Sequence, residues 1–152
     1  QTSQDDFNDT ISQNLTTAFS LVRACGNHWR RGGGSVVLMS TCAARLGLMN
    51  HEAIAAAKAG VEGLTRTAAA TYASRGIRFN AVAPGLVDTP LAQPITSSEP
   101  ALKASTAMHP LGRIGNPEEV ARLIGFLLNP VNDWITGQVI GIDGGLATVR
   151  GR

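Results

Sequence analysis

The sequence predicts an α/β fold built on a parallel sheet, with about three strands and their flanking helices present. Three short apolar runs, at 35–40, 77–82 and 138–142, have the length and composition of β-strands. The segments between them carry apolar residues at the period of an amphipathic helix. Strands that alternate with helices form parallel sheets with right-handed crossovers. Because a parallel sheet needs both faces covered and three strands make a thin one, we expect part of the domain to be absent.

The first helix is expected over residues 4–31, and three glycines at 32–34 suit its end. The run SVVLMS at 35–40 follows, and its continuous apolar character predicts a strand buried on both faces. The apolar stripe of the helix recurs mostly at steps of three and four and consists of Ile11, Leu15, Ala18, Phe19 and Val22.

A second helix is expected over residues 51–75. Asn50 can cap its start, Glu52 suits its first turn, and Gly76 suits a left-handed exit. The interior of this helix is rich in alanine. Such small side chains allow another backbone to approach closely.

The C-terminal half begins with the strand at 77–82, which Pro84–Gly85 ends. Residues 86–115 carry four prolines and few periodic apolar positions, which predicts a long functional loop with short helices. Asn116, followed by proline and two glutamates, is a strong start for a helix that runs to about residue 129.

The composition excludes several classes of function. Hydrophobic residues make up 43% of the 152 residues and charged residues 16%, with a net charge of +2. The densest cationic cluster, Arg30–Arg31, is too small for a nucleic-acid or membrane surface, and no apolar run could span a bilayer. Cys25 and Cys42 have no metal-ligand spacing, which favours free thiols in a reducing cytoplasm. Cys42 lies beside Thr41, but no base pairs with it in the sequence, so we interpret it as a small packing residue.

Several segments resemble, in the right order, the short-chain dehydrogenase/reductase family. They cover nearly the whole chain and comprise Asn14–Leu15 with Phe19 and Arg23, SVVLMS followed by Thr41, AAAKAG at 55–60 with Gly63–Leu64–Thr65, GIRFNAVAPG at 76–85 with Thr89, HPLGRIG at 109–115 with Pro117–Glu118–Glu119, Thr136–Gly137–Gln138, and Asp143–Gly144–Gly145. The resemblance implies a Rossmann-like, doubly wound parallel sheet. It also implies oxidoreductase activity that uses NAD or NADP on an alcohol or ketone.

The resemblance assigns a role to individual positions. Asn14 matches an asparagine whose backbone holds a relay water, and Thr41 matches a serine whose hydroxyl donates to the substrate oxygen. Lys58 matches a lysine that binds the nicotinamide ribose and lowers the pKa of a catalytic tyrosine. The implied cofactor-binding residues are Lys58, Pro84, Gly85 and Thr89, and no metal is implied.

Each of these residues also has a purely structural interpretation. Lys58 could be a solvated lysine on a helix surface, and Asn14 could be a polar residue in helix packing. Thr41 could satisfy the turn at the end of its strand, and Thr89 could cap a short helix. For Thr89 we expect both roles together.

The chain departs from the family at the catalytic tyrosine. Four residues before Lys58 stands Ile54, which has no transferable proton. His51 shares the same helix face and is a candidate substitute acid, although it could simply begin the helix. Ile54 could also belong to an apolar wall, with proton transfer supplied by water, by another residue or not at all.

The resemblance also bears on the extent of the domain. The chain contains neither G-x-x-x-G-x-G nor G-x-G-x-x-G, so we expect residues 1–152 to be the C-terminal part of one domain whose nucleotide-binding half is absent. The choice between NAD and NADP is undetermined without that half.

Substrate specificity should lie in 86–115 and 46–50. The complete protein should be a homodimer or homotetramer. Two functions stay open, an NAD(P)-dependent oxidoreductase and a non-catalytic subunit of the same fold.

Overall fold

The computed structural model describes residues 2–29 and 32–150. The three strands form one parallel sheet in the order β1-β2-β3. This arrangement confirms the predicted α/β fold with about three parallel strands. In chain order the elements are α1 (Gln4–Ile11), a π-helical turn (Ser12–Thr16), α2 (Thr17–His28), β1 (Gly34–Met39), a 3₁₀ turn (Cys42–Ala44), α3 (Glu52–Tyr72), a 3₁₀ turn (Ala73–Arg75), β2 (Ile77–Pro84), a 3₁₀ turn (Pro90–Ala92), α4 (Gln93–Thr96), α5 (Glu99–Met108), α6 (Pro117–Leu128), a 3₁₀ turn (Pro130–Asn132) and β3 (Val139–Ile142).

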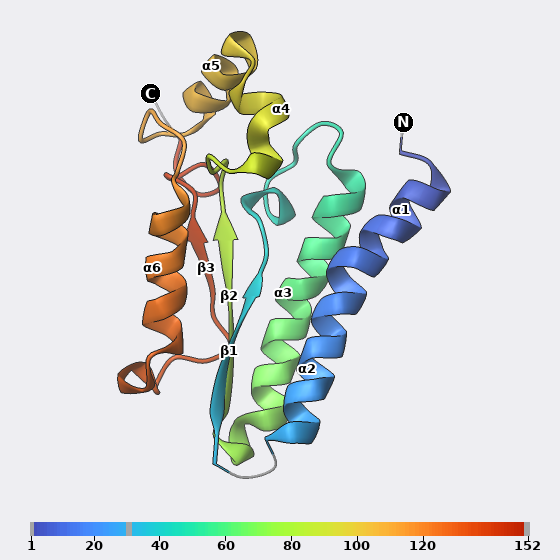
Figure 1. Cartoon of the computed structure of the whole chain (residues 1–152), viewed down its shortest axis with the longest axis vertical. Coiled ribbons are helices and arrows are strands. Elements are labelled where there is room, and N and C mark those ends of the chain that lie inside the picture. Colours follow the sequence, from blue (N-terminus) through green and yellow to red (C-terminus); the bar gives the residue numbers. More distant parts are fainter. Residues whose placement is uncertain (1, 30–31, 151–152) are drawn as a thin grey trace.

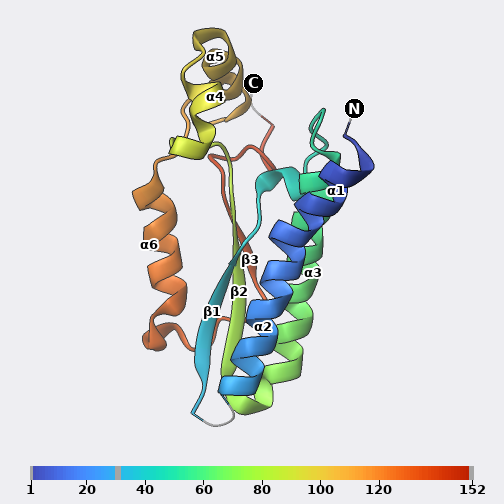
Figure 2. The same ribbon diagram turned by 45° about the vertical axis from the view of Figure 1, so that its right-hand side comes forward.

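Helices cover both faces of the sheet, as Figures 1 and 2 show. The helices α1, α2 and α3 lie on one face, and α6 lies on the other. The short helices α4 and α5 lie beyond the carboxyl ends of the strands (Figure 1). All eight residues of β2 are buried because this strand has a neighbour on each side and helices on both faces. One core cluster forms on the α2–α3 side and contains Val22, Val36, Leu38, Val61, Ala68, Ala69, Ile77, Phe79 and Ala81.

The first helix is not the continuous α-helix expected over residues 4–31. A π turn at Ser12–Thr16 divides it, and there the N–H of Thr17 reaches the carbonyl of Ser12, five residues back. Such turns are rare inside α-helices and are frequent at functional sites. The helix ends at His28, and Arg30–Arg31 lie outside the described residues.

Two further expectations need correction. Asn50 does not cap α3, because it takes a left-handed conformation with φ 61° and His51 occupies the cap position. Strand β1 is not buried on both faces, since Val36 and Leu38 are buried but Met39 is 44% exposed. The reason is that β1 pairs on one edge only within the described residues. Gly76, by contrast, has the expected left-handed conformation after α3, with φ 70°.

A buried arginine joins β2 to the end of α6. The guanidinium of Arg78 donates to the carbonyl oxygens of Leu127 at 3.0 Å, Ile135 at 2.9 Å and Asn129 at 3.4 Å. A cation is favourable there because the last carbonyls of a helix carry partial negative charge and lack partners within the helix. Asn80, also on β2, donates to the Ile135 carbonyl at 2.9 Å. These bonds fix the segment that turns from α6 into β3.

Residues 2–29 and 32–150 contain neither a metal-binding cluster nor a membrane span. No group of three or more His, Cys, Asp or Glu side chains in this part of the chain could hold a metal ion. No described helix combines the length and apolar character needed to cross a membrane. Cys25 and Cys42 are both free thiols.

Candidate functional site

The candidate site lies at the carboxyl edge of the sheet. Because the three strands are parallel, the segments that follow them meet at this edge (Figure 1). Thr41 lies two residues beyond β1, Pro84–Gly85 closes β2, and Asp143 directly follows β3. In open α/β sheets, ligands bind in the crevice outside the carboxyl ends of the strands.

Lys58 and Thr41 reach this edge from neighbouring elements. The ammonium of Lys58, in the second turn of α3, donates to the carbonyl of Met39 at the end of β1, at 3.0 Å. Burial lowers the pKa of Lys58. The hydroxyl of Thr41 makes a long hydrogen bond of 3.5 Å to the carbonyl of Pro84 and accepts the N–H of Ala43 at 3.3 Å. A cation and a hydroxyl donor therefore lie along one stretch of sheet edge, and both could face a bound oxygen.

Asn14 lies in the π turn, and this turn packs on α3. Gly60, two residues after Lys58, faces Leu15, and a Cβ at that glycine would come within 2.8 Å of the leucine side chain. This close approach brings the turn that holds Asn14 beside the turn that holds Lys58. The side-chain amide of Asn14 donates to the carbonyl of Thr10 at 3.0 Å. The expected role of its backbone, holding a relay water, stays a prediction.

A buried network that the sequence interpretation missed lies beneath Thr41 and Lys58. Glu62, one turn after Lys58 and only 7% exposed, accepts from the Ser40 hydroxyl at 3.0 Å and from the Arg45 guanidinium at 3.1 Å. These bonds tie the residue before Thr41 to the helix that carries Lys58. The one signal in the sequence is an acidic residue directly beside Val61 on the buried face of α3.

Hydrogen bonds fix the backbone after β2 on both sides of Val87, whose own N–H and C=O make none within the described residues. The Gly85 N–H donates to the Ile142 carbonyl at 3.2 Å. Further along, the Gly115 N–H donates to the Leu86 carbonyl at 2.9 Å, and its carbonyl accepts the Asp88 N–H at 3.0 Å. Since Gly115 pairs with the intervening Val87 as a parallel bridge, the N–H and C=O of Val87 point the opposite way. No hydrogen bond within the described residues occupies either group.

Gly85 belongs to the most crowded point of the site. A Cβ at this position would lie 2.7 Å from the His109 ring and 3.0 Å from the Asp143 backbone, so only glycine fits. The Asp143 carboxylate accepts the N–H groups of Gly145 and Ala147, both at 2.9 Å, and closes the turn after β3. The cofactor role expected of Pro84 and Gly85 stays a prediction. The sequence interpretation did not single out His109 and Val87, which lie in and beside this loop.

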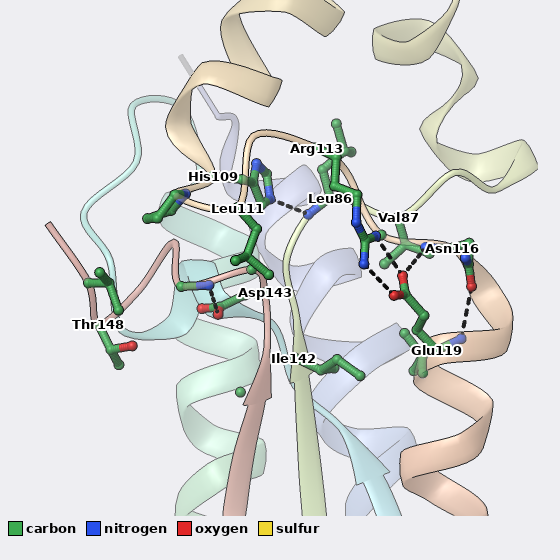
Figure 3. A pocket seen from close by; sticks show the side chains of 17 residues that line it. Leu86, Val87, His109, Leu111, Arg113, Asn116, Glu119, Ile142, Asp143 and Thr148 are labelled. Atoms are coloured by element: carbon green, nitrogen blue, oxygen red, sulfur yellow. Dashed lines mark hydrogen bonds and ion pairs between the residues drawn. The ribbon is translucent and has the colours of Figure 1, made fainter. Parts of the chain in front are cut away.

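A cavity of about 440 Å³ lies on the α6 side of this loop (Figure 3). Its wall includes the salt bridge between Arg113 and Glu119 at the start of α6. The Arg113 guanidinium and the Asn116 N–H hold the pKa of Glu119 at about 2. Asn116 caps the predicted helix start, and with Glu119 it forms a capping box, with 2.9 and 3.0 Å between each side chain and the other residue's N–H. The polar groups at this wall are paired with one another.

Thr89 occupies the cap position of the 3₁₀ turn at 90–92, but its hydroxyl makes no capping hydrogen bond. The expectation that it would cap a helix through its side chain is therefore wrong. The turn is closed by the backbone instead, where the Ala92 N–H donates to the Thr89 carbonyl at 2.9 Å. The other expected role of Thr89, a contact to the cofactor, stays a prediction.

Ile54 lies in the first turn of α3, one turn before Lys58, and is half-buried. His51 precedes α3, and its Nδ1 lies 2.8 Å from the Met49 carbonyl. Since a carbonyl only accepts, Nδ1 carries a hydrogen and Nε2 is not engaged in that bond. The one tyrosine of the chain, Tyr72, stands fourteen residues beyond Lys58, about 21 Å along the helix. It is therefore too far along α3 to reach the position one turn before Lys58, which Ile54 occupies.

Cys42 follows Thr41 but is poorly placed for nucleophilic chemistry. It is buried at the start of the 3₁₀ turn 42–44, and burial raises the pKa of its thiol. Its structure agrees with the expectation of a small packing residue.

Comparison with known proteins identifies the lineage. A family model described as enoyl-(acyl carrier protein) reductase matches residues 1–147. Over 144 residues the chain is 40% identical to the 3-oxoacyl-[acyl-carrier-protein] reductase FabG of Thermotoga maritima, covering 94% of this chain and 58% of the relative. The chain belongs to the short-chain dehydrogenase/reductase family.

Two further relatives of this short-chain dehydrogenase/reductase are informative. It is 43% identical over 133 residues to the cis-4-hydroxycyclohexanecarboxylate dehydrogenase of Sinomonas cyclohexanicum, covering 84% of this chain and 53% of the relative. It superposes on the structure of ElxO with NADP bound with a TM-score of 0.91 and 33% identity, covering 98% of this chain and 61% of ElxO. The Rossmann-like fold is thereby confirmed. The chain spans about half the length of the curated relatives it matches.

Proposed function

We propose that this chain supplies the catalytic edge and the nicotinamide-binding loop of an NAD(P)-dependent oxidoreductase that acts on a small alcohol or ketone. The observation that carries the proposal is the unoccupied N–H and C=O of Val87, fixed within the described residues at the same sheet edge as Lys58 and Thr41. A primary carboxamide such as that of nicotinamide presents one acceptor and two donors. The Val87 peptide groups complement this pattern.

The other residues suit the remaining parts of a nicotinamide nucleotide. Lys58 would release the Met39 carbonyl or share its ammonium with the ribose hydroxyls. The hydroxyl of Thr89, which makes no capping bond, would contact the carboxamide. Pro84 and Gly85 would form the floor of the loop. A bound nicotinamide would supply or accept the hydride. The NADP-bound structure of ElxO supports this assignment, and NAD and NADP both remain candidates.

We further propose that residues 1–152 form the C-terminal part of a single Rossmann-like domain, with a nucleotide-binding half preceding them. Two observations support this. The chain spans about half the length of its relatives. Within the described residues, β1 also has a free edge at which a further parallel strand could pair. The two free cysteines agree with a reducing compartment such as the cytoplasm.

Cofactor binding to the complete protein tests the proposal. NADH and NADPH titrations should show saturable binding of at least one of them by fluorescence. Lys58→Ala should weaken that binding by at least about tenfold, since it removes a cation from the ribose position. Arg66→Ala, which removes an exposed cation two turns further along the same helix, is the matched control and should bind normally. Absence of binding of both cofactors to the wild type would refute the proposal.

The alternative function is a non-catalytic subunit that keeps the fold. Ile54 favours it, because the catalytic turn of α3 offers no phenol and Tyr72 is too far away. A protein that binds NADPH or NADH but gives no turnover with a broad panel of ketones and alcohols would support this second function. Turnover of any substrate in that panel by the wild type would exclude it.

A further inference from the structure

His109 lies where three loops of the site meet (Figure 3). It follows α5 directly and is only 4% exposed. Its Nε2 lies 2.7 Å from the point that a Cβ on Gly85 would occupy, in the loop after β2. Its Cβ and Cδ2 lie 3.7 Å from the corresponding point on Gly144, in the loop after β3. The imidazole therefore fills the space between the ends of both strands and the short helices above them.

Both ring nitrogens of His109 are engaged. Nδ1 lies 2.7 Å from the Ser105 carbonyl in the last turns of α5, and the Leu86 N–H donates to Nε2 at 3.2 Å. A carbonyl oxygen can only accept and a backbone N–H can only donate. The ring is therefore neutral, with its hydrogen on Nδ1, and the two bonds use both its donor and its acceptor.

The bond from Leu86 occupies a particular place in the loop. Gly85 and Asp88 are held by backbone carbonyls, and the Leu86 carbonyl accepts from Gly115. The Leu86 N–H is the one backbone group of residues 85–88 that a side chain holds, within the described part of the chain. It lies one peptide before the free N–H of Val87. The acceptor on His109 thus fixes the orientation of the peptide next to the proposed carboxamide contact.

We propose that His109 is a positioning residue that couples α5 to the nicotinamide loop. Nε2 fixes the Gly85–Leu86 peptide and thereby the adjoining Leu86–Val87 peptide, whose N–H is the proposed carboxamide contact, while Nδ1 anchors the end of α5 above the same loop. Cofactor binding and the placement of the α4–α5 segment are then linked through one side chain. This inference rests on the proposed function for its effect on the cofactor, but its two hydrogen bonds can be tested without any cofactor.

Two variants separate the two bonds. In His109→Asn the side-chain amide can occupy the Nδ1 position and still donate to Ser105, whereas the acceptor for Leu86 is lost. In His109→Gln the side-chain carbonyl can occupy the Nε2 position and still accept from Leu86, whereas the anchor on Ser105 is lost. His28→Asn, at the exposed end of α2, is the matched control.

The readouts are hydrogen exchange of the peptides that cover residues 85–88 and 99–108, and the dissociation constant of NADPH or NADH. We expect the Asn variant to raise exchange at 85–88 and to weaken cofactor binding by about tenfold, with 99–108 unchanged. The Gln variant should raise exchange at 99–108 and leave cofactor binding within about threefold of the wild type. The same pattern in both variants, or no change in either, would overturn the inference.

A spectroscopic measurement on the wild type guards against misfolded variants. With ¹⁵N-labelled histidine in the complete protein, one ring should show the Nδ1-protonated neutral pattern, and that signal should vanish in both variants. A His109 ring that is protonated at Nε2 or at both nitrogens near neutral pH would contradict the inference. A wild type that binds neither cofactor would instead refute the proposed function, while the exchange pattern of the variants would still decide the role of His109.

Discussion

At the scale of single residues, the chemistry proposed for this site depends on which residue stands one turn before Lys58. Ile54 presents a half-buried aliphatic side chain there, so the lysine has no phenol to act on. A free tyrosine titrates near pH 10, and a neighbouring cation lowers that value towards the working pH. The ammonium that could do this is present, and burial already lowers its own pKa. Lys58 is thus present without the tyrosine that the family resemblance leads us to expect one turn before it.

Restoring the partner is therefore the most direct test of the site. Ile54→Tyr in the complete protein should raise NAD(P)H-dependent ketone reduction by at least about tenfold, because a positioned acid contributes about 10²- to 10⁴-fold. Reduction is followed by the loss of NADPH or NADH absorbance across a panel of ketones. Ile54→Phe adds the ring without the hydroxyl and should give no increase. A panel in which Phe and Tyr behave alike would show that any change comes from packing.

A second variant tests whether the wild type already has an acid. If His51 serves in place of the tyrosine, His51→Ala should abolish wild-type reduction, since Nε2 is the one ring nitrogen not engaged by Met49. His28→Ala, a distant and exposed histidine, is the control. An active wild type whose rate survives His51→Ala would leave water or another residue as the proton source.

The buried hydrogen bonds of Arg78 lead to a prediction about the stability of the protein. Arg78→Leu should lower the free energy of unfolding by about 2–4 kcal/mol, because it removes the three hydrogen bonds that this buried guanidinium donates to the segment between α6 and β3. Urea denaturation of the complete protein measures the loss. Arg66→Leu, on the exposed face of α3, should change stability by no more than about 0.5 kcal/mol. Equal losses in the two variants would mean that the buried bonds of Arg78 contribute nothing of their own.

Single residues also show where prediction from the sequence stops. Lys58 and Gly85 can be found because each belongs to a short local pattern. Glu62 and His109 escape prediction because the partners that tie them to other elements, Ser40 and Arg45 for Glu62 and Leu86 for His109, lie 17 to 23 residues away. Val87 escapes it for another reason, because its importance comes from backbone groups that a residue pattern does not express.

At the scale of elements, the start of α6 carries a pH-dependent contribution. The folded pKa of Glu119, about 2, is below its ordinary value of 4.5, because Arg113 and the Asn116 N–H favour the ionised form. Its stabilising effect is therefore fully present above about pH 4.5. It is lost as the pH falls from there towards 2.

The corresponding experiment compares denaturation midpoints of wild type and Glu119→Gln between pH 7 and pH 2.5. The wild type should be the more stable at pH 7, and its advantage should shrink steadily below pH 4.5. Glu118→Gln, which alters the neighbouring exposed carboxylate, should show no such convergence. An advantage that persists undiminished at pH 2.5 would contradict the assigned cause.

Most elements could be located from the sequence, and the exceptions have physical reasons. The helix start at Asn116 and the left-handed Gly76 are local signals, and the structure confirms both predictions. Nothing local marks the π turn at 12–16, because the same apolar spacing suits an unbroken α-helix. The contact that this turn makes, Leu15 against Gly60, is with a helix that lies far along the sequence.

At the scale of the whole molecule, the parallel sheet was predictable from the sequence, but the order of its strands was not. The alternation of helices and strands predicts parallel pairing, whereas the order β1-β2-β3 and the half-exposed β1 depend on which neighbours are present. We expect further elements or subunits of the complete protein to pack on the free edge of β1 and on the exposed faces of α2 and α3. Phe19, on α2, is 53% exposed although it is a large aromatic residue.

We predict that the complete protein is a homodimer or homotetramer that uses the α1–α2 and α3 surface. Light scattering coupled to size exclusion at micromolar concentration measures the assembly. Phe19→Asp should shift the population towards smaller species, because it places a charge on that surface. Arg23→Asp, which introduces a negative charge at an exposed position of the same helix, is the control. A difference between the two variants would show that the effect of Phe19→Asp is not due to charge alone. A monomeric wild type with full native structure would refute the prediction.

The π turn has a consequence for changes in chain length. A π turn holds one residue more than an α-helix would at the same place, and each residue of an α-helix adds about 100° of rotation and 1.5 Å of rise. Deleting Ser12 or Gln13, both exposed, would restore an unbroken α-helix but turn α1 by about 100° about its axis. The face of α1 that now rests on α3 would then point elsewhere. Substitution at these two positions should be well tolerated, and loss of either one should not.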